Sequence, residues 1–170
     1  MITISKPKPE DAEAIHNVMK TSWYATYPNK EIGVTKEDGD LSYPPEVEEK
    51  QIQVLRHRAE NPNDTDISLV AKEGDRVVGF IRLKIGDTST DLVSLYIDPE
   101  YTGKGVGTQL WHEAYKNLQS DNPIYVEVVS YTKAKDFYTK LGFVEIENYL
   151  DKEPLLSSGV RFPLTKMVFK

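Results

Sequence analysis

The spacing of apolar residues predicts three strands in the middle of the chain. Between residues 66 and 85, apolar side chains recur at every second position in two runs separated by Glu73-Gly74-Asp75, which is typical of an antiparallel hairpin. A turn over residues 86–90 leads into Leu92–Ile97, a run of aliphatic, β-branched and aromatic residues that predicts a third strand. The alternating inward positions are Ile67, Leu69, Ala71, Val77, Gly79, Ile81, Leu83 and Ile85.

Apolar residues spaced three and four apart predict four helices. Two lie before the strands, one opening at Pro9 and one at Pro44-Pro45, and residues 29–42 between them are predicted as a loop because they lack any period. The other two helices cover Thr108–Leu118 and residues 134–141. The inward positions are Ala12, Ile15, Val18 and Met19 in the first helix, Val47, Val54 and Leu55 in the second, Leu110, Trp111, Ala114 and Leu118 in the third, and Ala134, Phe137, Tyr138 and Leu141 in the fourth.

Four further strands complete the predicted order. They fall at Ile2–Ser5 and Ile124–Val129, and near Phe143–Glu147 and Phe162–Phe169. The order β-α-α-β-β-β-α-β-α-β-β predicts an α/β fold with a mixed α+β arrangement and a mostly antiparallel sheet. The helix between the fourth and fifth strands makes those two strands parallel. At 170 residues the chain fits one domain, which we expect to span residues 1–170.

A glycine-rich turn joins the strand Leu92–Ile97 to the helix that follows it. Gly103, Gly105 and Gly107 alternate there, and without Cβ atoms their amides can turn inward toward a ligand. The first turn of a helix also has unpaired N–H groups and a partial positive charge, so the sequence predicts a phosphate site. A plain strand-to-helix turn is the alternative. A nucleotide P-loop is disfavoured because the G-x-x-x-x-G-K-[ST] spacing is missing and the preceding strands are antiparallel.

The net charge of -6 and the absence of cysteine narrow the chemistry. Non-specific nucleic-acid binding needs an excess of cations, which this chain lacks. Without thiols there are no disulfides, no thiolate metal sites and no covalent thioester on the protein. His16, His57 and His112 fall on separate helices, so we expect solvated positions and no metal site. No segment resembles a leader or a membrane span, and we expect a cytoplasmic protein whose acidic surface serves solubility or a cationic substrate.

Two motifs together resemble those of one superfamily. Leu95-Tyr96-Ile97 followed by Thr102-x-x-Gly105-x-Gly107 is similar to an acetyl-CoA loop usually written Q/R-x-x-G-x-G/A. Residues 134–143 are similar to the helix motif A-x-x-F-Y-x-K-x-G-F, with Phe137 and Tyr138 at its centre. Both motifs, in this order and separated by one helix and one strand, resemble the GNAT superfamily of acyl-CoA N-acyltransferases. The resemblance extends through the remaining elements over nearly the whole chain.

The resemblance implies where acetyl-CoA or coenzyme A binds. In the family, loop amides hold the pyrophosphate and the pantetheine arm lies like an extra strand between the fourth and fifth strands. A helix terminus contributes about 0.3–1 kcal/mol, whereas micromolar affinity needs about 8 kcal/mol, so the arm must supply much of the binding. Thr102 and Tyr131 depart from the family pattern, where Gln or Arg and Asn are usual. The cofactor-binding residues expected are Leu95, Tyr96, Ile97, Thr102, Gly103, Lys104, Gly105, Val106, Gly107, Thr108, Tyr131 and Tyr138.

Two residues are candidates for proton transfer. The attacking amine has an ordinary pKa near 10.4, which is a handicap of roughly 4–5 kcal/mol at pH 7. Glu127 is the only acidic residue of its strand and is the candidate base, with a surface contact as the equal alternative. The resemblance implies that Tyr138 protonates the leaving thiolate, at a cost of about 2 kcal/mol between ordinary pKa values. A core aromatic at helical spacing is the alternative for Tyr138.

The aromatic cluster Trp23, Tyr24 and Tyr27 is the candidate acceptor site, with core packing as its alternative. It resembles a subgroup of the family that acetylates polyamines and similar small amines. We therefore expect an N-acetyltransferase that moves an acetyl group directly to a primary amine of a small polyamine-like molecule, through a ternary complex. A protein or peptide N-acetyltransferase and a non-catalytic acyl-CoA-binding module are the alternatives. The expected partners are the small amine and, as one option, a second copy of the chain, but not nucleic acid, a membrane or a metal.

Overall fold

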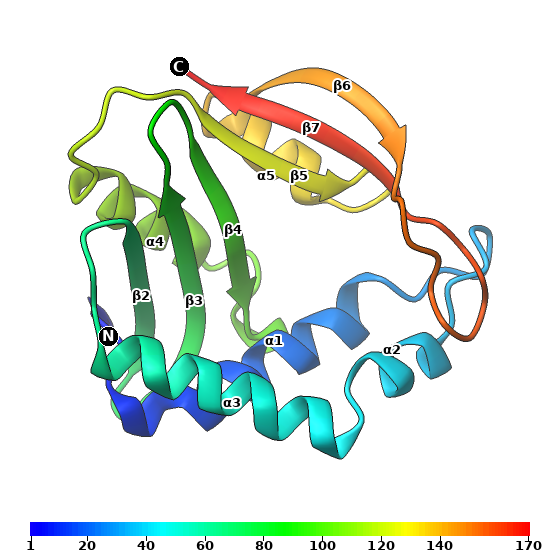
Figure 1. Cartoon of the computed structure of the whole chain (residues 1–170), viewed down its shortest axis with the longest axis horizontal. Coiled ribbons are helices and arrows are strands. Elements are labelled where there is room, and N and C mark those ends of the chain that lie inside the picture. The colour runs from blue at the N-terminus through cyan, green and yellow to red at the C-terminus, as the bar shows by residue number, and fades with distance from the viewer.

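The protein is built on one sheet of seven strands, in the order β1-β2-β3-β4-β5-β7-β6 (Figure 1). The computed structural model describes residues 1–170. The strands are β1 (Ile2–Ser5), β2 (Asp66–Glu73), β3 (Arg76–Ile85), β4 (Thr90–Ile97), β5 (Ile124–Val129), β6 (Val144–Leu150) and β7 (Pro163–Phe169). The helices are α1 (Ala12–Thr26), α2 (Lys36–Ser42), α3 (Pro45–Glu60), α4 (Val106–Lys116) and α5 (Ala134–Lys140), with short 3-10 turns at Pro9–Asp11 and Pro99–Tyr101.

Strands β4 and β5 form the one parallel pair, and they pair only at their beginnings. Thr90 lies opposite Ile124 and Asp91 opposite Tyr125, and no further residues of the two strands pair. On its other side β4 stays paired with β3 as far as Ile97, and β5 stays paired with β7 as far as Val129. The predicted mixed sheet with one parallel pair is confirmed. Past the first two residues, each strand therefore turns an unpaired edge toward the other.

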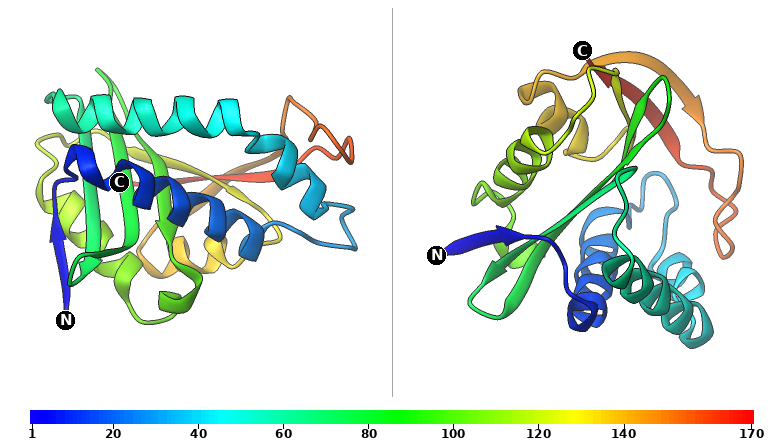
Figure 2. Two further views of the ribbon diagram at one scale, coloured as in Figure 1. Left: turned by 90° about the horizontal axis from the view of Figure 1, so that it is seen from below. Right: turned by 60° about the vertical axis from the view of Figure 1, so that its left-hand side comes forward.

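Helices cover both faces of the sheet (Figure 2). Ile15 and Val18 of α1 pack with Val70, Val77 and Phe80 in a small cluster on one face, and α3 lies against α1. On the other face α4 contributes to the main core. This larger cluster joins both halves of the sheet through Ile81, Leu83, Leu110, Trp111, Ala114, Ile124, Val126, Phe143 and Met167. None of the helices is both long and apolar enough to cross a membrane.

Helix α2 lies within the segment predicted as a loop, so that prediction is wrong for residues 36–42. The helix has no apolar period because its stability comes from other contacts. Thr35 and Asp38 form a reciprocal capping box at its start. Gly39 is buried against the ring of Trp23 so closely that a Cβ there would lie 2.5 Å from a ring carbon. A seven-residue helix held by a cap and one close contact leaves little periodic signal.

Two predictions about side-chain burial are also wrong. Val47 and Val54 of α3 are 37% and 39% exposed, and only Leu55 of the predicted inward face packs against the core. His16 was expected at a solvated position but is 3% exposed, because the polar side of α1 is covered by α3. Its Nε2 atom hydrogen-bonds Oε1 of Gln51 at 3.0 Å. The contact between α1 and α3 is thus partly polar, which an apolar period cannot reveal.

Candidate acyl-transfer site

The glycine turn is anchored firmly at its first residues. The carboxylate of Asp98 accepts a hydrogen bond from the Glu100 amide at 3.0 Å, which closes the 3-10 turn. The ring of Tyr101 is buried and its hydroxyl donates to Glu73 at 2.5 Å. The ammonium of Lys104 lies 4.7 Å from the centre of the same ring. The residues that follow therefore leave the sheet from a fixed point.

Five backbone amides of the turn have no acceptor within the protein. Gly103 and Gly105 both have φ of +79°, a left-handed conformation that suits glycine, and Gly105 is the N-cap of α4. The amides without an acceptor are those of Gly103, Gly105, Val106, Gly107 and Thr108. Their grouping at the positive end of an eleven-residue helix makes a site for an anion that needs no basic side chain.

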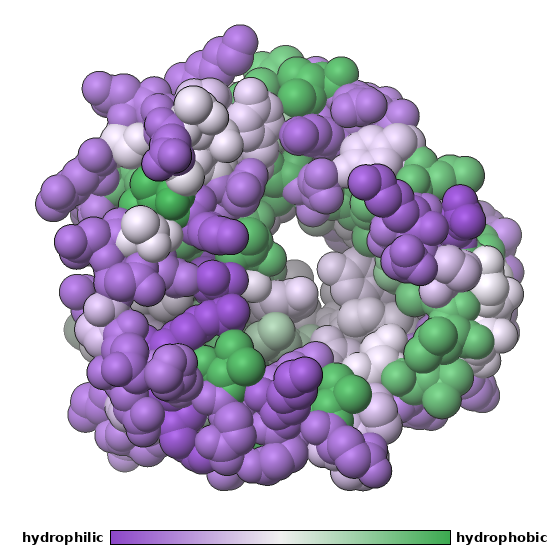
Figure 3. All heavy atoms as spheres, in the orientation of Figure 1, coloured by the Kyte–Doolittle hydropathy of each residue, from purple (hydrophilic) through white to green (hydrophobic).

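A cavity of about 480 Å³ begins at this turn and continues between β4 and β5 to the end of α1. In the space-filling view an opening lies between the two halves of the molecule (Figure 3). The cavity brings together twelve of the residues that the sequence singled out. They are Tyr27, Leu95, Tyr96, Ile97, Thr102, Gly103, Gly105, Val106, Gly107, Thr108, Glu127 and Tyr138. Four others, Trp23, Tyr24, Lys104 and Tyr131, do not line it.

The unpaired edges of β4 and β5 face this cavity. The Asp98 amide donates to the Val78 carbonyl at 2.9 Å, and strand amides alternate in direction, so the amides of Leu95 and Ile97 point toward β5. Likewise the Ser130 amide donates to the Pro163 carbonyl at 2.8 Å, so the backbone of Glu127 and Val129 points toward β4. An extended molecule lying between the strands would find donors and acceptors on both sides.

Tyr138 lies at the wall of the cavity with its side chain 5% exposed. Its ring packs edge-on against Phe137 and Phe143, with centroid distances of 5.1 and 5.2 Å. Phe137 in turn covers Gly107, where a Cβ would lie 3.3 Å from the ring. Burial, with smaller contributions from Tyr27 and Tyr96, raises the pKa of Tyr138, and no protein group hydrogen-bonds to its hydroxyl. Its proton therefore remains in place and is free to meet a ligand.

Glu127 presents an exposed carboxylate to the same cavity from the strand face opposite the main core. Tyr149 on β6 lies beside it, and burial, with a smaller contribution from the Glu127 carboxylate, raises the pKa of Tyr149. Tyr149 was not identified from the sequence. The alternation along β6 places Glu147 and Tyr149 on one face, but only the pairing of β6 with β7 brings that face beside β5. Glu127 and Tyr149 thus form a polar pair at the cavity.

The predicted acceptor aromatics separate into different environments. Tyr27 lines the cavity, and the buried indole of Trp23 packs edge-on against it at 5.6 Å. Tyr24 turns away and donates to Asp40 at 2.6 Å. Tyr131, expected at the cofactor, donates its hydroxyl to the Tyr27 carbonyl at 2.7 Å instead. Trp23 and Tyr131 therefore contact Tyr27, and of the four residues only Tyr27 reaches the cavity.

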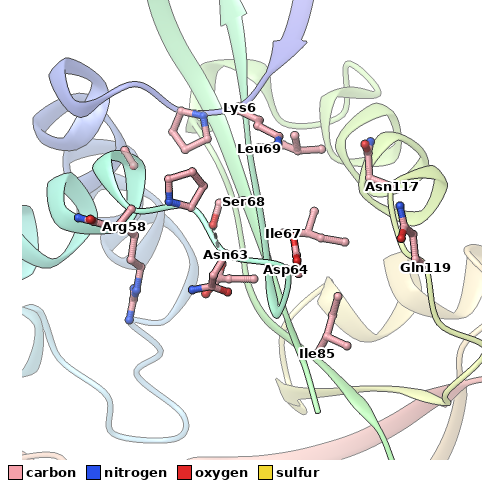
Figure 4. Close-up of a pocket in the computed structure, with 15 residues that line it drawn as sticks. Lys6, Arg58, Asn63, Asp64, Ile67, Ser68, Leu69, Ile85, Asn117 and Gln119 are labelled. Carbon is pink, nitrogen blue, oxygen red and sulfur yellow. Dashed lines mark hydrogen bonds between the residues drawn. The ribbon is translucent and has the colours of Figure 1, made fainter. Parts of the chain in front are cut away.

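A second cavity, of about 370 Å³, lies where β1 leaves the edge of β2 (Figure 4). It is lined by Lys6, Arg58, Asn63, Ser68, Asn117 and Gln119 among other residues, and by none of the predicted site residues. No group of three or more His, Cys, Asp or Glu side chains is arranged so that it could hold a metal ion. The chemistry expected from the sequence is therefore concentrated between β4 and β5.

Comparison with known proteins identifies the family of this chain. Residues 34–157 match the acetyltransferase (GNAT) domain. A spermidine N(1)-acetyltransferase of Thermoplasma acidophilum is 30% identical over 146 residues, which are 84% of this chain and 88% of the relative. The crystal structure of PaiA N-acetyltransferase from Thermoplasma acidophilum in complex with coenzyme A superposes with a TM-score of 0.69, at 26% identity over 98% of each chain. An acetyltransferase of the GNAT family from Streptococcus pneumoniae has the same fold, with a TM-score of 0.74 at 20% identity over 99% of each chain.

Proposed function

Since this chain belongs to the GNAT acetyltransferase family, we propose that it moves the acetyl group of acetyl-CoA directly to a primary amine of a small, polyamine-like molecule. The family resemblance expected from the two motifs is confirmed. Enzymes of this family use acetyl-CoA as co-substrate, which confirms the expected acyl donor. The residues that bind and react are the part that we propose here. One observation carries the proposal: a single cavity joins the free amides of the glycine turn to Tyr138 and Glu127.

The donor end fits coenzyme A in charge and in shape. The five free amides between Gly103 and Thr108 would hold the pyrophosphate, and Thr102 would add at most one side-chain contact. A helix terminus contributes about 0.3–1 kcal/mol of roughly 8 kcal/mol needed for micromolar binding. The rest would come from the pantetheine arm, whose amides pair with the open edges of β4 and β5 as an added strand would.

The transfer itself needs one donor of hydrogen bonds and one acceptor of a proton. The amides of Leu95 and Ile97 face the gap, where one of them would polarise the acetyl carbonyl. As the new N–C bond forms and the C–S bond breaks, sulfur gains negative charge beside the Tyr138 hydroxyl. Because burial raises the pKa of Tyr138, full proton transfer costs more than the ~2 kcal/mol between ordinary values. The hydroxyl therefore acts first as a hydrogen-bond donor to the departing sulfur.

Glu127 would take the proton that the amine must lose. At pH 7 the neutral amine is scarce, at a cost of roughly 4–5 kcal/mol, so a base at the cavity is valuable. The carboxylate of Glu127 is exposed at the cavity, and Tyr149 lies beside it. Its negative charge also attracts a protonated amine before the proton leaves. A polyamine carries several such groups, and the relative that is 30% identical is a spermidine N(1)-acetyltransferase.

A turnover assay tests the proposal. Purified protein is mixed with acetyl-CoA and, one at a time, spermidine, putrescine, an alkyl monoamine and a lysine-containing tripeptide, and thiol release is followed with acetylated product identified by mass spectrometry. We expect product from spermidine and putrescine, and loss of it in Tyr138→Phe but not in Tyr115→Phe, which changes an exposed tyrosine of α4. Tight acetyl-CoA binding with no release of coenzyme A in the presence of any of the amines would instead support a non-catalytic module.

A further inference from the structure

Two segments that lie far apart in the sequence meet beyond Tyr27 and bound the opening between the two halves of the molecule (Figures 1 and 3). One is the connection between β6 and β7, residues 151–162, and the other is the segment 27–43, which includes α2. Asp38 joins them. Its side chain is fully buried, and Oδ1 accepts hydrogen bonds from the Ser157 amide at 3.1 Å, the Ser158 amide at 2.8 Å and the Ser158 hydroxyl at 3.0 Å. We call this contact the clasp.

The other oxygen of Asp38 fixes the carboxylate to its own segment. Oδ2 accepts from the Thr35 amide at 2.9 Å and the Thr35 hydroxyl at 3.2 Å. Burial alone would raise the pKa of Asp38, but the hydrogen bonds from Thr35 and Ser158 hold it below its ordinary value, so the group is ionised at neutral pH. An ionised carboxylate with this many donors cannot be replaced by an amide without leaving donors facing each other.

A second contact connects the β6–β7 connection to Tyr27 at the cavity wall. The ring of Phe162, at the end of the β6–β7 connection, packs against Tyr27 with centroids 5.4 Å apart. The hydroxyl of Tyr131 donates a hydrogen bond to the Tyr27 carbonyl, and the ring centroids of Tyr131 and Phe162 are 6.5 Å apart. Tyr27 itself lines the cavity. Any movement of residues 151–162 away from α2 would therefore release the residue that forms the acceptor wall.

The clasp turns a V-shaped gap into a ring. Figure 1 shows β4 and β5 diverging and the β6–β7 connection meeting α2 and the loop before it on the far side. In the space-filling view the opening between the halves is bounded on every side (Figure 3). A gap open on one side would admit a bulky amine sideways. A closed ring admits only what can enter end-on.

We propose that the clasp selects the acceptor by shape, so that only slim, chain-like amines reach Tyr138, and that Asp38 is the positioning residue that keeps it closed. This inference rests on the proposed acetyl transfer. The acceptor would then be selected by the contact of Asp38 with residues 157–158, and not by the residues that touch the reacting atoms. Opening the clasp should leave the donor end unchanged, since the glycine turn has its own anchors at Asp98 and Tyr101.

The test compares a slim amine with a bulky one in three variants. We measure kcat/KM for spermidine and for a lysine-containing tripeptide in the unmodified protein, in Asp38→Asn and in the milder Ser158→Ala, with Glu37→Gln as the control on the exposed side of α2. In the unmodified protein we expect spermidine to be favoured at least about tenfold. In Asp38→Asn this preference should fall about tenfold through a gain for the tripeptide, and less in Ser158→Ala. The KM for acetyl-CoA should stay within about twofold.

Three results would overturn the inference: an unmodified protein that takes both amines equally, a preference that survives in Asp38→Asn and Ser158→Ala, or an equal fall for both amines. Hydrogen exchange at the Ser157 and Ser158 amides shows whether each variant has opened the clasp while the rest stays folded. Calorimetric binding of both amines to the protein with coenzyme A present is measured alongside. If no amine is acetylated, the proposed function fails, and the ratio of the two dissociation constants still decides whether the clasp selects by shape.

Discussion

The glycine turn and the wall around Tyr27 lie at opposite ends of one cavity, and they are built in different ways. The turn presents free backbone amides that a local run of residues exposes, from Gly103 to Thr108, and these amides are the proposed donor contacts. The wall depends on side chains from three distant segments, since Tyr27 is held by Tyr131 and by Phe162. The donor end is therefore a local structure, and the acceptor end is a tertiary one.

Because the two ends are built differently, different substitutions should disrupt them. Backbone amides tolerate most side-chain changes but not a change of φ at their glycines. A wall of packed side chains tolerates backbone changes elsewhere but not the loss of one supporting ring or hydrogen bond. Donor binding and acceptor binding should consequently respond to separate substitutions, and the residue between the two ends should affect turnover more than either.

The largest effect is expected at Tyr138, which lies between the two ends. Tyr138→Phe keeps the edge-on contacts with Phe137 and Phe143 and removes only the hydroxyl. We expect kcat to fall about 10²-fold, the lower end of typical acid–base effects, with acetyl-CoA affinity little changed. Steady-state kinetics with both substrates varied measures this. An unaltered kcat would remove Tyr138 from the reaction.

The donor end should be broken by a backbone change alone. Gly105→Ala puts a Cβ on a residue with φ of +79°, which costs about 1–2 kcal/mol unless the turn relaxes and its amides move. We expect the KM for acetyl-CoA to rise about tenfold while the KM for the amine stays nearly constant. Gly74→Ala is the matched control, because its φ is +60° in the turn between β2 and β3, it does not line the cavity, and no atom lies near the added Cβ. It should lower stability without changing either KM.

The acceptor end should respond in the opposite sense. Tyr27→Ala removes the ring that Phe162 and Trp23 support, so we expect the KM for the amine to rise severalfold and that for acetyl-CoA to change by less than about twofold. Tyr27→Phe keeps the ring and serves as control. Equal changes in both constants would show that the two ends are not separate.

A smaller effect is expected in alkaline solution. Burial raises the pKa of Tyr131 to about 12, and it also raises the pKa of Tyr27 and Tyr138. Since the unfolded chain loses these protons near pH 10 and the folded chain holds them longer, the free energy of unfolding should fall as pH rises above 10. Denaturant titrations between pH 8 and 11 measure the slope. Tyr131→Phe should make the slope shallower, and a slope that does not change would mean that the acceptor wall does not hold this proton.

The glycine turn and the helix that carries Tyr138 could be predicted from the sequence, because each is determined by residues that are neighbours in the chain. Three glycines after a strand, and Phe137-Tyr138 on one helix face, have the same neighbours in any compact fold of this chain. The strand order and the parallel pair follow from hydrophobic spacing and from the crossover helix. The interpretation of these features as a GNAT site came from the resemblance and not from the spacing itself.

The acceptor end could not be read in the same way. Asp38 lies in a segment without apolar period, and its partners Ser157 and Ser158 come about 120 residues later. Tyr131 was expected at the cofactor because it occupies a family position with that role. The position does not reveal that its hydroxyl donates a hydrogen bond to the Tyr27 carbonyl. Val47 and Val54 were expected inward since helical spacing marks an apolar stripe but not whether a partner covers it.

If acetyl-CoA and the amine occupy the cavity together, two-substrate initial-rate kinetics should show it. Acetyl-CoA and spermidine are varied against each other, and the product is identified as acetylated spermidine by mass spectrometry. We expect the double-reciprocal lines to intersect, as a ternary complex requires. Parallel lines would instead indicate that the acetyl group passes to the protein and coenzyme A leaves before the amine binds. Either parallel lines or thiol release without acetylated amine would show that the two substrates do not react in a ternary complex.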